Sequence, residues 1–220
     1  MWLKKIQIKK VSARGTKKTN DQLLIEKKSN IYLNNTLITK LYHTPKNEHE
    51  LALGYCYIHH QLDPENIHIK QEKNNIYITG PTKDISPLTK EALKFHDTTV
   101  FKLTAKFQEN AYLFKQTAIS ESAAISSQND ILFFAEDINQ WQAIYKVIGH
   151  CIKEKKLTLN NKCLLISSKI DEPLVSACYK INIFNIISRT AATALAYDKA
   201  IEYGMKLIGF ARGTKYSIYT

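Results

Sequence analysis

The chain has 220 residues, of which 44% are hydrophobic, and its 31 lysines and arginines against 20 acids give a formal net charge of +11. A chain of this length can bury one substantial core, so folding needs no metal or disulfide. Its apolar runs are shorter than the roughly 20 residues of a membrane-spanning helix, and its first residues lack the apolar core of a signal peptide. We therefore expect a soluble cytoplasmic protein with no membrane contact.

Residues 1–97 are predicted to form a small β-rich lobe. Residues 1–40 alternate apolar and polar positions in short runs, a pattern typical of antiparallel strands. Apolar side chains recur at helical spacing in residues 47–58, which predicts a helix of about three turns. Residues 67–78 have the pattern of a β-hairpin. Residues 80–97 are expected to be a loop with a short helix and to form the hinge between two lobes.

Residues 98–220 are predicted to form an α/β core. Asp137 is well placed to cap a helix with one apolar side, and Gly204 to end another. The expected elements are helix 104–117, strands 118–126 and 131–135, the helix after Asp137, strand 163–167, helix 172–180, strand 183–187, helix 190–203 and strand 206–210. Strands joined by helices indicate a largely parallel sheet flanked by helices.

Polar residues follow four of the predicted strands. Since the carboxyl ends of parallel strands meet at one edge of a sheet, these residues should converge on that edge, which we call the rim. They are Glu136 and Asp137, Ser168 and Lys169, Ser188 to Thr190, and Ala211 to Gly213. Three of the four ends carry a cation, and the helices that follow present free N–H groups there. The rim is therefore predicted to bind phosphate or another anion.

The four cysteines are Cys56, Cys151, Cys163 and Cys178, and no two form a Cys-x-x-Cys pair. Their wide spacing and apolar neighbours favour buried thiols in a reducing compartment over a disulfide framework. Cys178, near a predicted helix end, is the only one whose pattern allows an exposed thiol.

The excess of positive charge is concentrated near the amino terminus, where the first 30 residues hold nine bases and two acids. Such an imbalance favours an anionic partner, either nucleic acid, a nucleotide cofactor or an acidic protein surface. A solvated lysine-rich face is the simpler interpretation.

Residues 136–149 read EDINQWQAIYKVIG. Their spacing resembles the signature E-D-x-G-R-H-N-A-x-D-K-x-I-G of the formate dehydrogenase accessory sulfurtransferases, the FdhD/NarQ family. Upstream, residues 50–55 resemble that family's E-L-A-x-G-F helix, and residues 114–124 resemble its F-x-x-T-G-G-x-H-x-A-A run. Downstream, residues 167–169, 190–196 and 209–213 resemble its S-G-R, S-A-P-T-x-L-A and G-F-x-R-G segments.

The resemblance implies a cytidine-deaminase-like core and a role in passing sulfur from a cysteine desulfurase to the molybdenum cofactor of formate dehydrogenase. It also implies that molybdopterin guanine dinucleotide, or a GDP-like nucleotide, binds at the rim, and that the protein forms a homodimer. The zinc motifs of true deaminases, His-x-Glu and Pro-Cys-x-x-Cys, do not occur in the sequence. We therefore expect neither zinc nor deamination.

The candidate cofactor-binding residues follow from the rim and the resemblance together. Arg212 ranks first, because its segment keeps the family pattern and a guanidinium can hold phosphate with two hydrogen bonds. Arg189 and Lys169 also follow strands, and the hydroxyl groups of the set are candidate donors. The full set is Phe210, Ala211, Arg212, Gly213, Thr214, Lys215, Arg189, Lys169, Ser167, Ser168 and Thr193.

The chain departs from the family where sulfur would be carried. Persulfide transfer needs an exposed, activated thiol, and the family places a Cys-x-x-Cys in the loop after the strand at residues 76–79. Here residues 80–97 contain no cysteine. Glu121 and Trp141 stand where the family has histidines, and Trp141 is expected to fill the core rather than stack on a base.

Three functions remain open at this point. The first is a formate dehydrogenase accessory protein of the sulfurtransferase type whose catalysis is degenerate. The second is a noncatalytic chaperone or regulator that binds a guanine nucleotide or a molybdopterin cofactor. The third is nucleic-acid binding through the basic amino terminus, which the scarcity of aromatic residues between its lysines disfavours.

Overall fold

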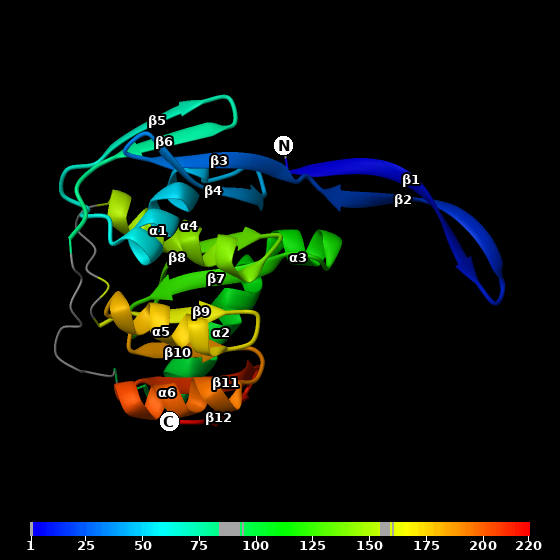
Figure 1. Ribbon diagram of the computed structural model, residues 1–220. Coiled ribbons are helices and arrows are strands. Elements are labelled where there is room, and N and C mark those ends of the chain that lie inside the picture. The colour runs from blue at the N-terminus through cyan, green and yellow to red at the C-terminus, as the bar shows by residue number, and fades with distance from the viewer. Residues whose placement is uncertain (1, 84–92, 94, 155–158, 160) are drawn as a thin grey trace.

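The computed structural model describes residues 2–83, 93, 95–154, 159 and 161–220. The chain forms a four-stranded sheet, a six-stranded sheet with helices on both faces, and a two-stranded ribbon that projects away from both (Figure 1). The predicted α/β class is confirmed, while the cytidine-deaminase-like detail stays a prediction. No helix in the described part of the chain is long and apolar enough to cross a membrane.

The projecting ribbon consists of β1 (Leu3–Ser12) and β2 (Gly15–Leu24), and we call it the arm. The two strands pair antiparallel along their whole length, from Leu3 opposite Leu24 to Ser12 opposite Gly15. At the base of the arm, the side-chain amide of Gln22 donates to the side chain of Gln116 over 3.0 Å. The arm therefore joins the body at its base and extends outward from there (Figure 1).

The four-stranded sheet has the order β4-β3-β6-β5. Its strands are β3 (Lys27–Leu33), β4 (Thr36–His43), β5 (His68–Glu72) and β6 (Asn75–Thr79), and α1 (Glu48–His60) covers it. Ile31, Ile76 and Ile78 of the sheet are buried against Leu53 and Cys56 of the helix. α1 also packs along α4 (Gln140–Lys153) of the rest of the chain. Much of the predicted hinge, residues 84–92 and 94, lies outside the described residues, and the boundary near residue 97 stays a prediction.

The six-stranded sheet has the order β12-β11-β10-β9-β7-β8. Its strands are β7 (Glu121–Ser126), β8 (Ile131–Asp137), β9 (Cys163–Ile166), β10 (Asn185–Ser188), β11 (Lys206–Arg212) and β12 (Lys215–Ile218). β9, β10 and β11 are parallel, whereas β7, β8 and β12 run antiparallel to their neighbours. The sheet is mixed around a parallel centre, because β7–β8 and β11–β12 are joined by short turns that require antiparallel pairing.

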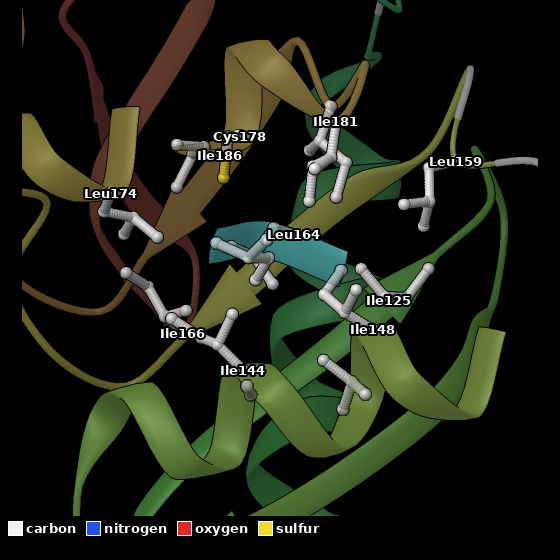
Figure 2. Close-up of a cluster of buried hydrophobic side chains, with 14 of the residues drawn as sticks. Ile125, Ile144, Ile148, Leu159, Leu164, Ile166, Leu174, Cys178, Ile181 and Ile186 are labelled. Atoms are coloured by element: carbon white, nitrogen blue, oxygen red, sulfur yellow. The ribbon is translucent and has the colours of Figure 1, made fainter. Parts of the chain in front are cut away.

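Helices cover both faces of this sheet. α4, α5 (Glu172–Lys180) and α6 (Ala194–Tyr203) pack on one face, and α2 (Asp97–Asn110) packs on the other. Successive strand residues point to opposite faces, so Leu164 faces α4 and α5 while Leu165 faces α2. Figure 2 shows Leu164 and Ile166 surrounded by Ile144 and Ile148 of α4 and by Leu174 of α5.

The single helix predicted at residues 104–117 is wrong, because the chain forms two helices, α2 and α3 (Tyr112–Thr117), that meet at Ala111. The Glu136 carboxylate accepts hydrogen bonds from the backbone N–H groups of Leu113 (2.7 Å) and Phe114 (2.8 Å). A helix start needs such acceptors for its free N–H groups. A carboxylate on a distant strand therefore stabilises a helix start that local periodicity does not show.

The prediction that Asp137 caps α4 is wrong. The cap is Asn139, whose side chain accepts from the backbone N–H of Trp141 over 2.9 Å. Asp137 is fully buried in β8, where one carboxylate oxygen accepts from the backbone N–H of Thr44 (2.8 Å) and the other lies 2.5 Å from Nζ of Lys146. Lys146 also donates to the Thr44 hydroxyl over 2.7 Å. The Asp137–Lys146 pair thus attaches Thr44, the residue after β4, to the six-stranded sheet, which we call the large sheet.

Candidate functional site

The carboxyl ends of four strands meet at one edge of the large sheet. β8 and β9 are both antiparallel to β7, and β10 and β11 continue parallel to β9, so all four point the same way. The amino end of β7, at Glu121, lies at the same edge, opposite Asp137. This edge is the rim expected from the sequence.

Arg189 and Arg212 come together on the rim from two neighbouring strands. The Arg212 side chain donates from Nε to the backbone carbonyl of Arg189 over 2.8 Å. Burial, and after it the positive charge of Arg212, lower the pKa of the Arg189 guanidinium. Among the described residues, neither arginine forms an ion pair with an acid. Two adjacent guanidinium groups without a paired carboxylate suit an anion such as phosphate.

The backbone beside this pair has an unusual conformation. Phe210 has a φ of 51°, and the residue is 49% exposed. A bulky residue rarely adopts positive φ, because its Cβ crowds the backbone. The conformation is fixed by a register shift between β11 and β12 at Gly209 to Arg212, and by a 2.9 Å hydrogen bond from Phe210 N–H to the Thr190 carbonyl. The strained backbone turns an exposed aromatic ring toward the solvent next to Arg212.

An open depression with a volume of about 720 Å³ lies beside this segment. Its lining combines cations, hydroxyl groups and aromatic rings from β11, β12 and the start of α2. The lining residues are Asp97, Phe101, Phe210, Arg212, Thr214, Lys215, Tyr216 and Ser217. Tyr216 donates its hydroxyl to Asp97, and this hydrogen bond raises the pKa of the tyrosine. Among the described residues, Asp97 forms no ion pair with Arg212 or Lys215. Such a lining can receive a ligand that has both an anionic part and a planar ring.

The other residues of the predicted segment 210–215 differ in exposure. Gly213 and Thr214 are exposed in the turn between β11 and β12, and Lys215 is exposed at the start of β12. Gly213 has a φ of +56° that glycine adopts without strain. Ala211 is only 1% exposed and packs in the core beneath them. The turn therefore presents its side chains on the rim while Ala211 anchors it.

Ser167 and Ser168 lie on the rim, but their hydroxyl groups already donate to one carboxylate oxygen of Glu121. Ser167 Oγ also accepts from the backbone N–H of Ser122 over 2.9 Å. The sequence drew attention to Glu121 only as a departure from the family pattern, and did not place it in the site. Its position at the start of β7 is a feature of strand order, so no local pattern predicts this contact.

Lys169 and Thr193 have structural partners on the rim. Lys169 forms an ion pair with Asp171, which caps α5, and Thr193 caps α6 by accepting from the backbone N–H of Ala196. Both residues are exposed, but these contacts stabilise helix starts. Of the predicted cations, Arg189, Arg212 and Lys215 have no acid partner among the described residues.

The prediction that Cys178 could be an exposed thiol is wrong. Its side chain is 2% exposed and points into the core between Leu164 and Ile186 (Figure 2). Cys56, Cys151 and Cys163 are buried as well. Burial raises the pKa of Cys56 and Cys151 to about 12 and raises that of Cys163 and Cys178 further. In this conformation none of these thiols is accessible or ionised at neutral pH, which sulfur transfer requires.

Trp141 is half-buried against the main core at the start of α4. Its ring stacks on Tyr145 at a centroid distance of 5.7 Å, and His59 contacts both rings. His59 also makes a 2.8 Å hydrogen bond with the Tyr145 hydroxyl. Trp141 therefore contributes to packing, as predicted, while one part of its surface stays open to solvent.

The FdhD/NarQ family model matches residues 78–220, which include every strand of the large sheet and the whole rim. The chain belongs to the FdhD/NarQ family. The FdhD protein of Methanocaldococcus jannaschii is 28% identical over 221 residues, covering 99% of this chain and 96% of that protein. A sulfur carrier protein FdhD from Saccharolobus solfataricus is 28% identical over 205 residues, covering 80% of this chain and 79% of that protein.

The FdhD fold is also found in a solved structure. A crystal structure of a candidate formate dehydrogenase accessory protein from Desulfotalea psychrophila matches 100% of this chain and 97% of its own, with a TM-score of 0.89 and 17% sequence identity. This likeness extends over the arm and both sheets. With 17% sequence identity, this match shows that the two proteins share a fold.

Proposed function

We propose that this chain is a formate dehydrogenase accessory protein that binds a guanine nucleotide, either free or as the end of a molybdopterin guanine dinucleotide, at the rim. The observation that carries the proposal is the meeting of Arg189 and Arg212 without a paired acid. Two guanidinium groups can grip the two phosphates of such a ligand. Similar proteins are named a sulfur carrier protein FdhD and a formate dehydrogenase accessory protein, and these names support a role in the service of formate dehydrogenase.

The lining of the depression fits the remainder of the ligand. Phe210 and Phe101 offer ring faces on which a planar base can stack. The hydroxyl groups of Thr214 and Ser217 can donate to phosphate or sugar oxygens. The molybdenum cofactor would be cargo here, and the residues of this chain would hold and orient it.

We further propose that the chain does not itself carry sulfur. All four cysteines of the sequence are buried, and burial raises the pKa of every one of these thiols. The protein would then act as a cofactor-binding chaperone beside a catalytic partner that supplies sulfur, such as a cysteine desulfurase. The cytoplasmic location expected from the sequence and the homodimer implied by the family resemblance both stay predictions.

Calorimetric titration of GDP at low salt tests the binding site. We expect micromolar binding by the natural chain and a loss of about tenfold or more in Arg212→Ala, since a charged hydrogen bond contributes roughly 1.5–3 kcal/mol. Arg14→Ala, which removes an arginine from the tip of the arm, is the matched control and should bind GDP normally. Absence of GDP binding by the natural chain would refute the site.

Mass spectrometry after incubation with a cysteine desulfurase and cysteine tests the second part. We expect all four cysteines to remain unmodified under native conditions. A persulfide on any one of them would show that the chain is a sulfur carrier, and Cys→Ser variants would locate it.

A further inference from the structure

The tip of the arm carries a dense, unbalanced positive charge. Residues 9–18 hold five cations and no acid. Lys9 lies directly opposite Lys18, and Lys10 directly opposite Lys17. Directly paired residues share a face of a ribbon and adjacent pairs alternate, so each face of the tip carries one lysine pair. The tip is thus positive on both faces.

This arrangement is unfavourable for the isolated protein. Like charges placed directly across two strands repel each other, and a two-stranded ribbon on its own has marginal stability. Within the described residues, no cation of the arm forms an ion pair. A partner that supplies negative charge would relieve the repulsion, which makes the tip suited to an anionic surface.

The side chains of the arm favour a protein over nucleic acid as that surface. No aromatic residue occurs between Leu3 and Leu24, so the arm has no ring on which a base could stack. Val11 at the tip is 77% exposed and Leu23 is 48% exposed. Apolar side chains gain from contact with another protein surface, and both outer edges of the ribbon offer backbone groups for a further strand. A second copy of this chain is a poor occupant for the tip, because its net charge is also +11.

The arm is anchored next to the rim. Its base residue Gln22 contacts Gln116 in α3, and the chain continues from there through Ser120, which donates to Glu136, into Glu121 on the rim. Figure 1 shows the arm extending outward on the side of α3. The base of the arm is therefore connected to the β7–β8 end of the rim, whereas Arg189 and Arg212 lie at its β10–β11 end.

We infer that the tip of the arm, residues 9–18, is a docking element for an acidic protein surface, and that this surface belongs to the formate dehydrogenase which the chain serves. The identity of the partner rests on the proposed function, whereas the chemistry of the surface rests on the arm alone. Long-range attraction by the lysines accelerates the encounter, and Val11 contributes apolar contact once the surfaces meet.

Binding of purified apo formate dehydrogenase from the same organism, measured by surface plasmon resonance over a salt series, tests the inference. The test variant is Lys9→Glu, Lys10→Glu, Lys17→Glu and Lys18→Glu together. The matched control reverses four exposed lysines of the body, Lys40, Lys73, Lys83 and Lys102, and so has the same net charge. We expect the tip variant to lose about tenfold or more in affinity, mainly through a slower association rate, and the control to change far less.

Each other outcome has a distinct meaning. Equal losses in both variants, or unchanged binding by the tip variant, would overturn the arm as the docking element while leaving the proposed function intact. Poly-L-glutamate and a 20-bp DNA duplex serve as further probes. Failure to bind formate dehydrogenase, with tip-dependent capture of poly-L-glutamate, would refute the partner and support the acidic protein surface. Tip-dependent binding of the duplex alone would overturn the inference in favour of nucleic acid.

Discussion

Gly54 in α1 lies so close to the backbone of Tyr145 in α4 that a Cβ atom on Gly54 would be 1.9 Å from the Tyr145 carbonyl oxygen. Gly149 of α4 makes the reciprocal approach, since its Cβ would be 1.8 Å from the carbonyl oxygen of Glu50. The two helices therefore touch through their backbones, and this contact holds the four-stranded sheet to the large sheet.

Gly54→Ala should separate these helices and destabilise the protein. Overpacking of a tight contact costs about 1–3 kcal/mol and more where backbone atoms must move, so we expect a clear fall in the melting temperature. The control is Gly213→Ala, where no atom lies within 4 Å and only backbone strain at φ +56° is added. Equal falls in the two variants would contradict the close helix contact.

Lys146→Met should be strongly destabilising, because it leaves Asp137 as a buried carboxylate without its cation. Removing one partner of a buried ion pair costs about 3–5 kcal/mol. Adding Asp137→Asn removes the orphan charge, and the asparagine oxygen can still accept from Thr44 N–H. Denaturant unfolding should therefore show the double variant to be more stable than Lys146→Met alone; the reverse order would show that the ion pair is not what matters.

His43 makes the folded state sensitive to mild acid. The ring is fully buried between the Thr44 carbonyl and the Ser29 hydroxyl, and burial lowers its pKa. The unfolded chain then takes up a proton first as the pH falls, so stability is greatest above the unfolded pKa near 6.5 and declines below it. The decline is at most about 1.4 kcal/mol per pH unit for one group.

Denaturant unfolding checks this dependence. The natural chain and His43→Gln are compared between about pH 7.5 and pH 5, a range that brackets the histidine pKa of about 6.5 in the unfolded chain. We expect a smaller loss of stability with acid in the variant. Burial also lowers the pKa of His59. The variant His59→Gln therefore shows how much of the change in stability with pH comes from this second histidine. Identical slopes in the natural chain and His43→Gln would exclude the buried ring as the source.

Phe210 offers a test of backbone strain at the rim. Phe210→Gly and Phe210→Ala both remove the ring, but at φ 51° glycine is unstrained and alanine is not. We expect the glycine variant to be more stable by about 1 kcal/mol, the opposite of the order in ordinary structure. GDP binding should weaken in both variants. Thermal unfolding that favours alanine would show that the positive φ is not maintained in solution.

The class of fold and much of the order of its elements follow from the amino-acid pattern alone. Periodicity within single elements predicts α4 and α5, because apolar residues on one side of a helix show in a short window. Alternation of strands with helices predicts the rim, since it places several strand ends at one edge. The family landmarks lie in the same order along the chain, and the family match to residues 78–220 confirms the membership that they indicated.

Which of those residues act together depends on how distant elements pack in three dimensions. Arg189 directly follows β10 while Arg212 ends β11, and Glu121 reaches Ser167 because β7 pairs with β9. The same holds for Cys178, whose place at the end of a helix leaves open whether its side chain meets solvent or Leu164. The physical reason is that local spacing fixes the face on which a side chain lies, whereas its burial and partners depend on elements that pack against that face from distant parts of the chain.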